Sequence, residues 1–284
     1  MILNSSGSEE VEENMPAHTI ALAMRKGGVG KSTVCSQLAL ALEGLGHRVL
    51  AVDLDPQSTL TGQLGITPPA GLPPLADALL AADFSHSYVK HPTRDLYLVP
   101  GDDAFGEEEL IRIRNHGPEH VHLLRRALAP LLNYFTFILI DSMPSINVTT
   151  RMVAFSSDLV ILPTEPTIES LRMLSNTMSH FYTWLQHRPE VDPSLFLKVL
   201  LTKVPAREKE LMANAAETLS HLRTPPFQTL ISLSSAVPKA TAHSRPVALW
   251  RKSGHEFTNL AAEVIAYAEH VAQSRAARAA AAPA

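Results

Sequence analysis

Residues 26–33 read KGGVGKST and bring three glycines, two lysines and two hydroxyl side chains together within eight positions. Glycines let backbone N–H groups turn inward around phosphate oxygens, and a helix that begins at such a loop adds positive potential. In a loop of this kind we expect Lys31 to reach the β- and γ-phosphates of a nucleotide, Ser32 to ligate Mg²⁺ and Thr33 to contact the α-phosphate. The segment therefore predicts a nucleotide site, formed by Lys26, Gly27, Gly28, Val29, Gly30, Lys31, Ser32 and Thr33.

The loop departs from the usual spacing G-x-x-x-x-G-K-[ST] at its first position. Arg25 stands where the first glycine belongs, and Lys26 adds a second lysine. A glycine-rich turn that carries surface lysines is the alternative interpretation. The flanking sequence favours the phosphate site, because an apolar run (18–24) precedes the loop and a helical pattern (32–46) follows it, as a phosphate-binding loop requires.

Three aspartates stand at the ends of apolar runs of strand length, namely Asp53, Asp55 and Asp141. Residues two apart in a strand face the same side, and open α/β sheets bind ligands at the carboxyl ends of their strands. We expect Asp141, which ends the run FILID, to hold Mg²⁺ through a water molecule next to Ser32. The alternative for Asp53 and Asp55 is that one of them only caps a turn.

Apolar runs of strand length alternate with helical patterns along the chain. Nearly continuous Val, Ile and Leu runs are typical of strands buried on both faces, hence of a mostly parallel sheet, and right-handed crossovers place helices on both sides. The fold class is therefore α/β, a mostly parallel twisted sheet with helices on both faces, of the P-loop NTPase type. The expected strands are 18–24, 47–55, 95–101, 135–141, 158–164, 195–204 and 227–233, and the longest helix is 167–187.

Composition narrows the class of protein further. The 284 residues carry a net charge of −4, so any contact with nucleic acid needs a local basic patch. A single cysteine, Cys35, excludes a disulfide framework and a four-cysteine metal site within one chain, and no apolar run is long enough for export or a membrane span. We expect a disordered acidic arm at 1–17, one folded domain at 18–272 and an Ala-rich flexible tail at 273–284.

Together with DLDPQ (53–57) and FILID (137–141), the loop resembles the deviant Walker A box of the ParA/MinD superfamily of ATPases, over most of the chain. The resemblance implies ATP and Mg²⁺ as cofactors and a homodimer that forms with ATP. It also implies that Lys31 serves the nucleotide of its own subunit, whereas Lys26 crosses the dimer interface to the phosphates of the other. That second role accounts for the extra lysine.

The same resemblance suggests roles for residues outside the loop. Asp55 matches the residue that orients or activates the attacking water, and Asp53 matches the residue that supports the Mg²⁺ shell and the loop. The catalytic set is then Lys26, Lys31 and Asp55. Thr202 or Lys203 lies where relatives line the adenine pocket, with packing at the end of a strand as the alternative.

Within the superfamily, DLDPQ and the stretch 96–111 look closest to the ParA/Soj partition branch. In that branch the ATP-bound dimer binds DNA without sequence preference, and a ParB-like centromere-binding partner stimulates hydrolysis, which segregates a plasmid or chromosome. We then expect a cytoplasmic protein that associates with the nucleoid when ATP is bound. Leu233 and Ala236 stand near places where many relatives carry paired arginines. The remaining candidates for DNA contact are Arg207, Lys209, Arg223, Lys239, Arg245 and Arg251.

Two other functions stay open at this point. One is a ParA/MinD-like ATPase that positions a cargo other than DNA, such as a chemoreceptor array or the flagellar or division machinery. The other is a P-loop metabolic enzyme or nucleotide kinase. Membrane targeting is not expected, because the C-terminal residues are mostly alanine and alanine buries too little apolar area to anchor a helix on a bilayer.

Overall fold

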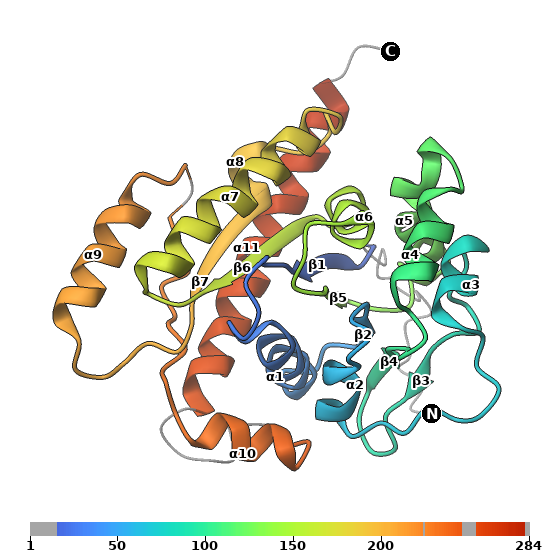
Figure 1. Cartoon of the computed structure of the whole chain (residues 1–284), viewed down its shortest axis with the longest axis horizontal. Helices are drawn as coiled ribbons and strands as arrows, with labels where there is room; N and C mark the ends of the chain where they lie inside the picture. The colour runs from blue at the N-terminus through green and yellow to red at the C-terminus, as the bar shows by residue number, and fades with distance from the viewer. Residues whose placement is uncertain (1–15, 224, 246–253, 282–284) are drawn as a thin grey trace, which may run out of the picture.

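The protein is described from a computed structural model, for residues 16–223, 225–245 and 254–281. Its centre is one sheet with the strand order β3-β4-β2-β5-β1-β6-β7 (Figure 1). All neighbouring strands are parallel except β3 and β4. The strands are β1 (His18–Leu22), β2 (Val49–Asp53), β3 (Val89–Lys90), β4 (Leu96–Val99), β5 (Phe137–Asp141), β6 (Leu159–Thr164) and β7 (Leu197–Leu201).

Helices cover both faces of the sheet, as the strand pattern predicts (Figure 1). One face packs against α1 (Lys31–Gly44), α2 (Thr59–Leu64), α10 (Ala236–Ala242) and α11 (Gly254–Ala281). The opposite face packs against α3 (Leu75–Leu80), α4 (Glu107–Arg114), α5 (Leu123–Leu128), α6 (Val148–Ser156), α7 (Ile168–Leu185), α8 (Pro193–Phe196) and α9 (Lys209–Ser220). Short 3₁₀ turns at Pro118–His122 and Ala129–Leu131 flank α5.

Alternation along the strands explains the two cores. In β1, Ile20 and Leu22 lie in the core under α1 and α11, whereas Ala21 lies in the core on the other face. Successive side chains of a strand point to opposite faces, and all five residues of β2 and of β5 are buried. The mostly parallel sheet and its two helical layers confirm the predicted fold class.

One expected strand is wrong. Residues 227–233 run beside β7 and its continuation, and four backbone hydrogen bonds join them, including Phe227 N–H to Val199 O and Ile231 N–H to Leu201 O, both at 2.9 Å. Within the described residues, however, the segment forms a single isolated bridge, between Val204 and Ser232, rather than a strand. The carboxylate of Glu263 accepts the N–H groups of Gln228 and Thr229.

Glu256 accepts the N–H of Ser232 at 3.0 Å in the same way. Because Glu263 takes the N–H of Thr229, which lies between the two donors that reach β7, the segment does not pair regularly with that strand. Periodicity alone did not reveal that competition.

The ends of the predicted domain also differ from expectation. Ala17 is buried, and its N–H donates to Leu132 O at 2.7 Å, so the folded part includes the last residue of the expected arm, while residues 1–15 lie outside the described ranges. At the other end α11 continues to Ala281, which makes most of the expected tail 273–284 helical. No helix in the described ranges is both long and apolar enough to cross a membrane.

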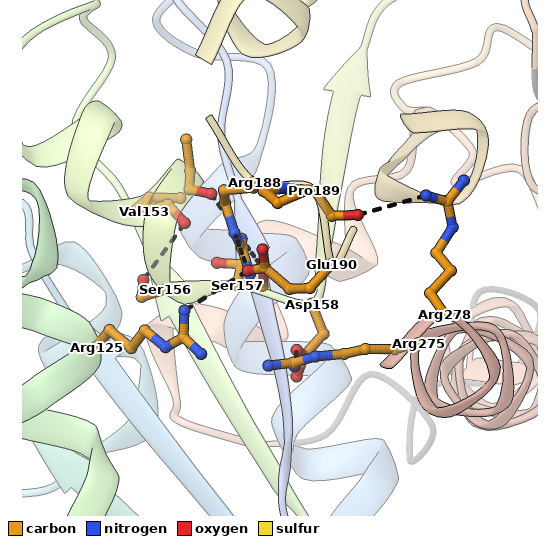
Figure 2. A network of polar contacts seen from close by, with 11 residues as sticks. Arg125, Val153, Ser156, Ser157, Asp158, Arg188, Pro189, Glu190, Arg275 and Arg278 are labelled. Atoms are coloured by element: carbon orange, nitrogen blue, oxygen red, sulfur yellow. Dashed lines mark hydrogen bonds and ion pairs between the residues drawn. The ribbon is translucent and has the colours of Figure 1, made fainter. Parts of the chain in front are cut away.

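A polar network at the amino-terminal edge of the sheet explains why the end of α11 is held in place (Figure 2). Arg275 pairs with Asp158, and the other carboxylate oxygen of Asp158 accepts the Thr19 N–H at 2.9 Å. Arg278 donates to the carbonyl of Pro189. The arginines of the predicted tail thus bind the loops that lead into the strands.

Arg188 is the buried centre of this network, with only 3% of its surface exposed. Its Nη1 donates to the carbonyls of Ala154 and Ser157 at 2.8 and 2.7 Å, which satisfies the C-terminal end of α6. Its Nε pairs with Glu190 at 3.0 Å. Burial lowers the pKa of Arg188, and the charge of Glu190 opposes that change.

We expect Arg188→Ala to lower the free energy of unfolding by about 3 kcal/mol, since removing one member of a buried charge pair leaves uncompensated polar groups. Urea unfolding followed by circular dichroism measures the change. The matched control is Arg125→Ala, because Arg125 contacts the same Glu190 at 3.6 Å but is 48% exposed, and exposed pairs contribute about 0–1 kcal/mol. Equal losses for the two variants would contradict the role assigned to Arg188.

Candidate functional site

The predicted phosphate loop connects β1 to α1 at the carboxyl edge of the sheet. Gly28 and Gly30 have φ angles of 77° and 93°, in the left-handed region that favours glycine. A Cβ placed on Gly27, Gly28 or Gly30 would meet no atom within 4 Å, so the loop borders open space. Because the first turn of a helix presents unpaired N–H groups, the loop and α1 form a cradle that fits phosphate oxygens.

Lys31 is the first residue of α1, and only 6% of its surface is exposed. Burial lowers the pKa of its ammonium group, while the negative charges of Asp141 and Asp55 oppose that change. The second lysine of the motif is therefore a buried cation close to two carboxylates and at the base of the loop. The contact of Lys31 with the nucleotide of its own subunit stays a prediction.

The surroundings of Asp141 show whether a divalent cation fits the site. Asp141 is fully buried at the end of β5, and neither carboxylate oxygen has a hydrogen-bond partner among the described residues. Burial raises its pKa well above the usual range, and the charge of Asp53 adds to the increase. The nearby Ser32 hydroxyl opposes this rise in pKa, although it does not form a hydrogen bond with either carboxylate oxygen.

A buried carboxylate without partners is costly unless a cation compensates it. Mg²⁺ takes oxygen ligands and keeps several waters. Ser32 and Asp141 therefore fit the predicted magnesium site, with the Ser32 hydroxyl as a ligand and Asp141 acting through a water.

Asp53 ends β2, the strand next to the one that Asp141 ends, and Asp55 lies two residues beyond it. Asp53 pairs with Asp141 in the register of β2 and β5. Its Oδ2 accepts the N–H of Thr61 at 2.9 Å and the hydroxyl of Thr61 at 2.8 Å, and its Oδ1 accepts the N–H of Asp55 at 3.2 Å. Asp53 thus fixes the segment that carries Asp55, while its role in supporting the Mg²⁺ shell and the loop stays a prediction.

Asp55 is the more available carboxylate of the two. It is 9% exposed, whereas Asp53 is fully buried. One of its oxygens accepts the N–H of Gln57 at 3.0 Å, as in the turn-capping alternative, and the other has no hydrogen bond with a described residue. The catalytic role of Asp55 stays a prediction.

Lys26 lies at the start of the loop and turns toward α7 of its own chain. Its Nζ donates to Ser170 Oγ at 2.9 Å and lies 3.4 Å from Glu169 and 3.6 Å from Glu165. The predicted contact with a second subunit stays a prediction.

Sequence reasoning had not assigned Glu165 a role, although it directly follows the β6 strand. The rule that selected Asp55 and Asp141, a carboxylate at the end of an apolar run, also selects Glu165. Its other oxygen binds Lys203 at 2.9 Å, so this carboxylate holds two lysines.

The two adenine candidates occupy different positions. Thr202 is buried, and its hydroxyl donates to the carbonyl of Val29 in the loop at 2.9 Å, which matches the alternative of packing at the strand end. Lys203 has a φ of 52° and an exposed side chain that pairs with Glu165. An adenine contact by Lys203 stays a prediction.

The candidate DNA residues lie on the surface but not on one element. Arg207 and Lys209 lie at the start of α9 and Arg223 lies beyond its end, whereas Lys239 lies on α10 and Arg245 lies beyond it. Figure 1 shows α9 at the left and α10 at the bottom of the view, as separate helices. All five are exposed, and Arg251 falls outside the described residues.

The glycine loop, the buried lysine and the unpartnered aspartate at the carboxyl edge of a parallel sheet define a P-loop nucleotide-binding protein. The profile of the AAA domain family matches residues 17–190. The chain belongs to this family and, within it, to the ParA/MinD superfamily of ATPases, as its two-lysine loop implied.

Relatives and solved structures agree with that assignment. Chromosome partitioning protein ParA from Caulobacter vibrioides is 31% identical over 259 residues, which cover 88% of this chain and 94% of ParA. Apo McdA from Cyanothece superposes with a TM-score of 0.75 at 21% identity, over 88% of this chain and 99% of McdA. The septum site-determining protein MinD from Pyrococcus horikoshii, solved with Mg-ADP, gives 0.68 at 23%, over 87% and 96%.

Proposed function

We propose that the protein is an ATP-dependent partition ATPase of the ParA type, which uses ATP and Mg²⁺ to form a dimer that binds DNA without sequence preference. The observation that carries the nucleotide part is the buried pair of Lys31 and Asp141 below an open glycine loop. The likeness to the Caulobacter partition protein over nearly the whole of both chains supports partition as the purpose.

The chain's own residues suggest how hydrolysis proceeds. The loop N–H groups and Lys31 bind the β- and γ-phosphates, and Ser32 and Asp141 hold the cation, which when bound neutralises phosphate charge. Asp55 orients the attacking water, and its position is fixed through Asp53. Lys26 from a second copy adds positive charge where the transferred phosphoryl group becomes more negative. Cations supplied by another subunit in this way raise the hydrolysis rate by about 10³–10⁵.

We expect Asp55→Ala to bind ATP and dimerise normally but to lower turnover by at least about 100-fold, because general-base catalysis contributes about 10²–10⁴. Steady-state release of inorganic phosphate measures the effect, with a fluorescent ATP analogue as the binding assay. Asp95→Ala is the matched control, since Asp95 pairs with Arg48 and Lys90 away from the site. Turnover like that of the unmodified chain would move the water-orienting role to another residue.

A mobility-shift assay on random-sequence DNA tests the proposed DNA binding. It compares ATP, ADP and no nucleotide across a salt series. We expect a mobility shift of the DNA with ATP but not with ADP or without nucleotide. The affinity should fall as salt rises, because binding by lysines and arginines releases counterions from the DNA phosphates. Arg207→Ala and Lys239→Ala should each reduce the slope of log affinity against log salt by about 0.9 if the residue contacts one phosphate, whereas Arg114→Ala on the distant helix α4 should not.

Positioning of another cargo is the second candidate, since MinD, named as a septum site-determining protein, shares the fold. Its nucleotide chemistry would be the same. Affinity capture of partners from the native host, with the Asp55→Ala variant held in the ATP state, separates the two. A DNA-binding partner of the ParB kind supports partition, while a receptor or division protein together with the absence of an ATP-dependent DNA shift supports the second candidate.

A further inference from the structure

A cavity of about 570 Å³ lies next to the Asp53–Asp55 segment, on the side away from the glycine loop. Its walls come from the start of α2, the proline-rich loop 65–74 before α3 and the end of β4. Pro56, Pro68, Pro74 and Leu72 provide apolar surface. No part of the mechanism above uses this cavity.

The charges in the cavity have one sign. Asp102 and Asp103 are among its lining residues, and no lysine, arginine or histidine is. Asp102 accepts the N–H of Leu75 at 3.2 Å and that of Ala104 at 3.0 Å. The carboxylate of Asp103 is exposed and has no ion pair or hydrogen bond with any residue in the described ranges. The cavity therefore combines apolar walls with negative charge that is not neutralised locally.

Ser87 adds an independent observation. It lines the same cavity and is 4% exposed, and its hydroxyl lacks a hydrogen-bond partner among the residues that the structure describes. Buried hydroxyls usually find a partner. The wall thus offers an unsatisfied polar group in addition to the carboxylates.

We propose that this cavity docks an arginine side chain from a partner protein, and that docking acts on the segment that carries Asp55. The planar guanidinium stacks on flat apolar surfaces such as proline rings and presents five donors to carboxylate and hydroxyl oxygens. Its aliphatic stem packs against apolar walls while the charged head meets the acidic rim. Docking itself does not depend on the proposed ATPase function, whereas its effect on turnover does.

Two hydrogen bonds connect the cavity wall to Asp53. The N–H of Gly101, which lines the cavity, donates to Thr61 Oγ1 at 2.8 Å, and that hydroxyl donates to Asp53 Oδ2 at 2.8 Å. Asp53 in turn accepts the N–H of Asp55 at 3.2 Å. Packing is tight here, because a Cβ on Gly101 would lie 2.7 Å from Ser58 Oγ and 3.0 Å from Asp53 Cγ. The cavity wall and the Asp53–Asp55 segment are therefore joined by short contacts, and we expect docking to act on Asp55 through them.

Amide NMR of the full chain without nucleotide tests the docking. The probe is the peptide Ac-Leu-Arg-Leu-NH2 at millimolar concentration, and the matched peptide carries citrulline, a neutral isostere, in place of arginine. We expect shifts at Thr61, Gly101 and Asp103 with the arginine peptide, and affinity lower by about tenfold with citrulline or in Asp103→Lys, which corresponds to roughly 1.4 kcal/mol. Glu217→Lys, an exposed charge reversal on α9, should leave the affinity unchanged.

Equal affinity for both peptides, shifts confined to residues away from the cavity and from the Asp53–Asp55 segment, or unchanged affinity in Asp103→Lys would each overturn the docking site. ATP hydrolysis with the arginine peptide tests the coupling separately. We expect turnover to change at least twofold in the unmodified chain and not in Asp103→Lys, whose basal turnover should be normal. Peptide binding with unchanged turnover in an active enzyme would overturn the coupling, whereas a chain that never hydrolyses ATP would contradict the proposed function and leave the NMR result standing.

Discussion

Lys31→Ala is expected to weaken ATP binding by at least about 100-fold, which amounts to roughly 3 kcal/mol. Lys31 is the one lysine of the loop that is buried, at 6% exposure. Burial lowers the pKa of its ammonium group, and the charges of Asp141 and Asp55 oppose that change. Without Lys31, the negative charge of the phosphates would approach those two carboxylates with no cation between them. Titration with a fluorescent ATP analogue in the presence of Mg²⁺ measures the loss.

Lys239→Ala is the control for this experiment, because Lys239 is an exposed lysine on α10 and its removal should change ATP affinity less than twofold. Circular dichroism of each variant shows whether the fold is retained. Normal ATP affinity in a folded Lys31→Ala variant would contradict the whole assignment of the site, including the role of Asp141.

Much of the site follows from local sequence because its parts stand at the ends of elements. A parallel sheet brings the carboxyl ends of its strands to one edge, so Asp53 and Asp141 become neighbours in register. The glycine loop needs only the strand before it and the helix after it. For these residues, the position along the chain was almost sufficient to predict the position in the fold.

Contacts between distant segments could not be predicted in the same way. Thr61 holds Asp53 from a helix that starts after the strand, and Glu165 holds Lys26 from 139 positions away along the chain. The failed strand at 227–233 has the same origin, since Glu263 on α11 takes the Thr229 N–H that would otherwise face β7. The hydrophobic periodicity of one sequence indicates which residues are buried. It does not indicate which distant carboxylate accepts a given backbone N–H.

The position of Lys26 bears on how a dimer would form. In the single chain its ammonium has three partners, of which Glu169 is 71% exposed and Glu165 is 19% exposed. Exposed ion pairs contribute about 0–1 kcal/mol, whereas a charge-assisted contact with a phosphate contributes about 1.5–3 kcal/mol. If Lys26 acts across a dimer interface as proposed, an exchange of its exposed pair with Glu169 for a phosphate of the second subunit would therefore be favourable.

Lys26→Ala is expected to bind ATP but to fail to dimerise. A two-fold symmetric dimer contains the contact twice, so the loss should be about 3–6 kcal/mol, or roughly 10²–10⁴ in the dimerisation constant. Size-exclusion chromatography with light scattering in ATP and Mg²⁺, in the Asp55→Ala background to prevent hydrolysis, measures the dimer. Glu169→Gln is the matched control, since it removes only an exposed intramolecular partner and should leave the dimer intact. An intact Lys26→Ala dimer would show that the second lysine of the loop does not act across the interface.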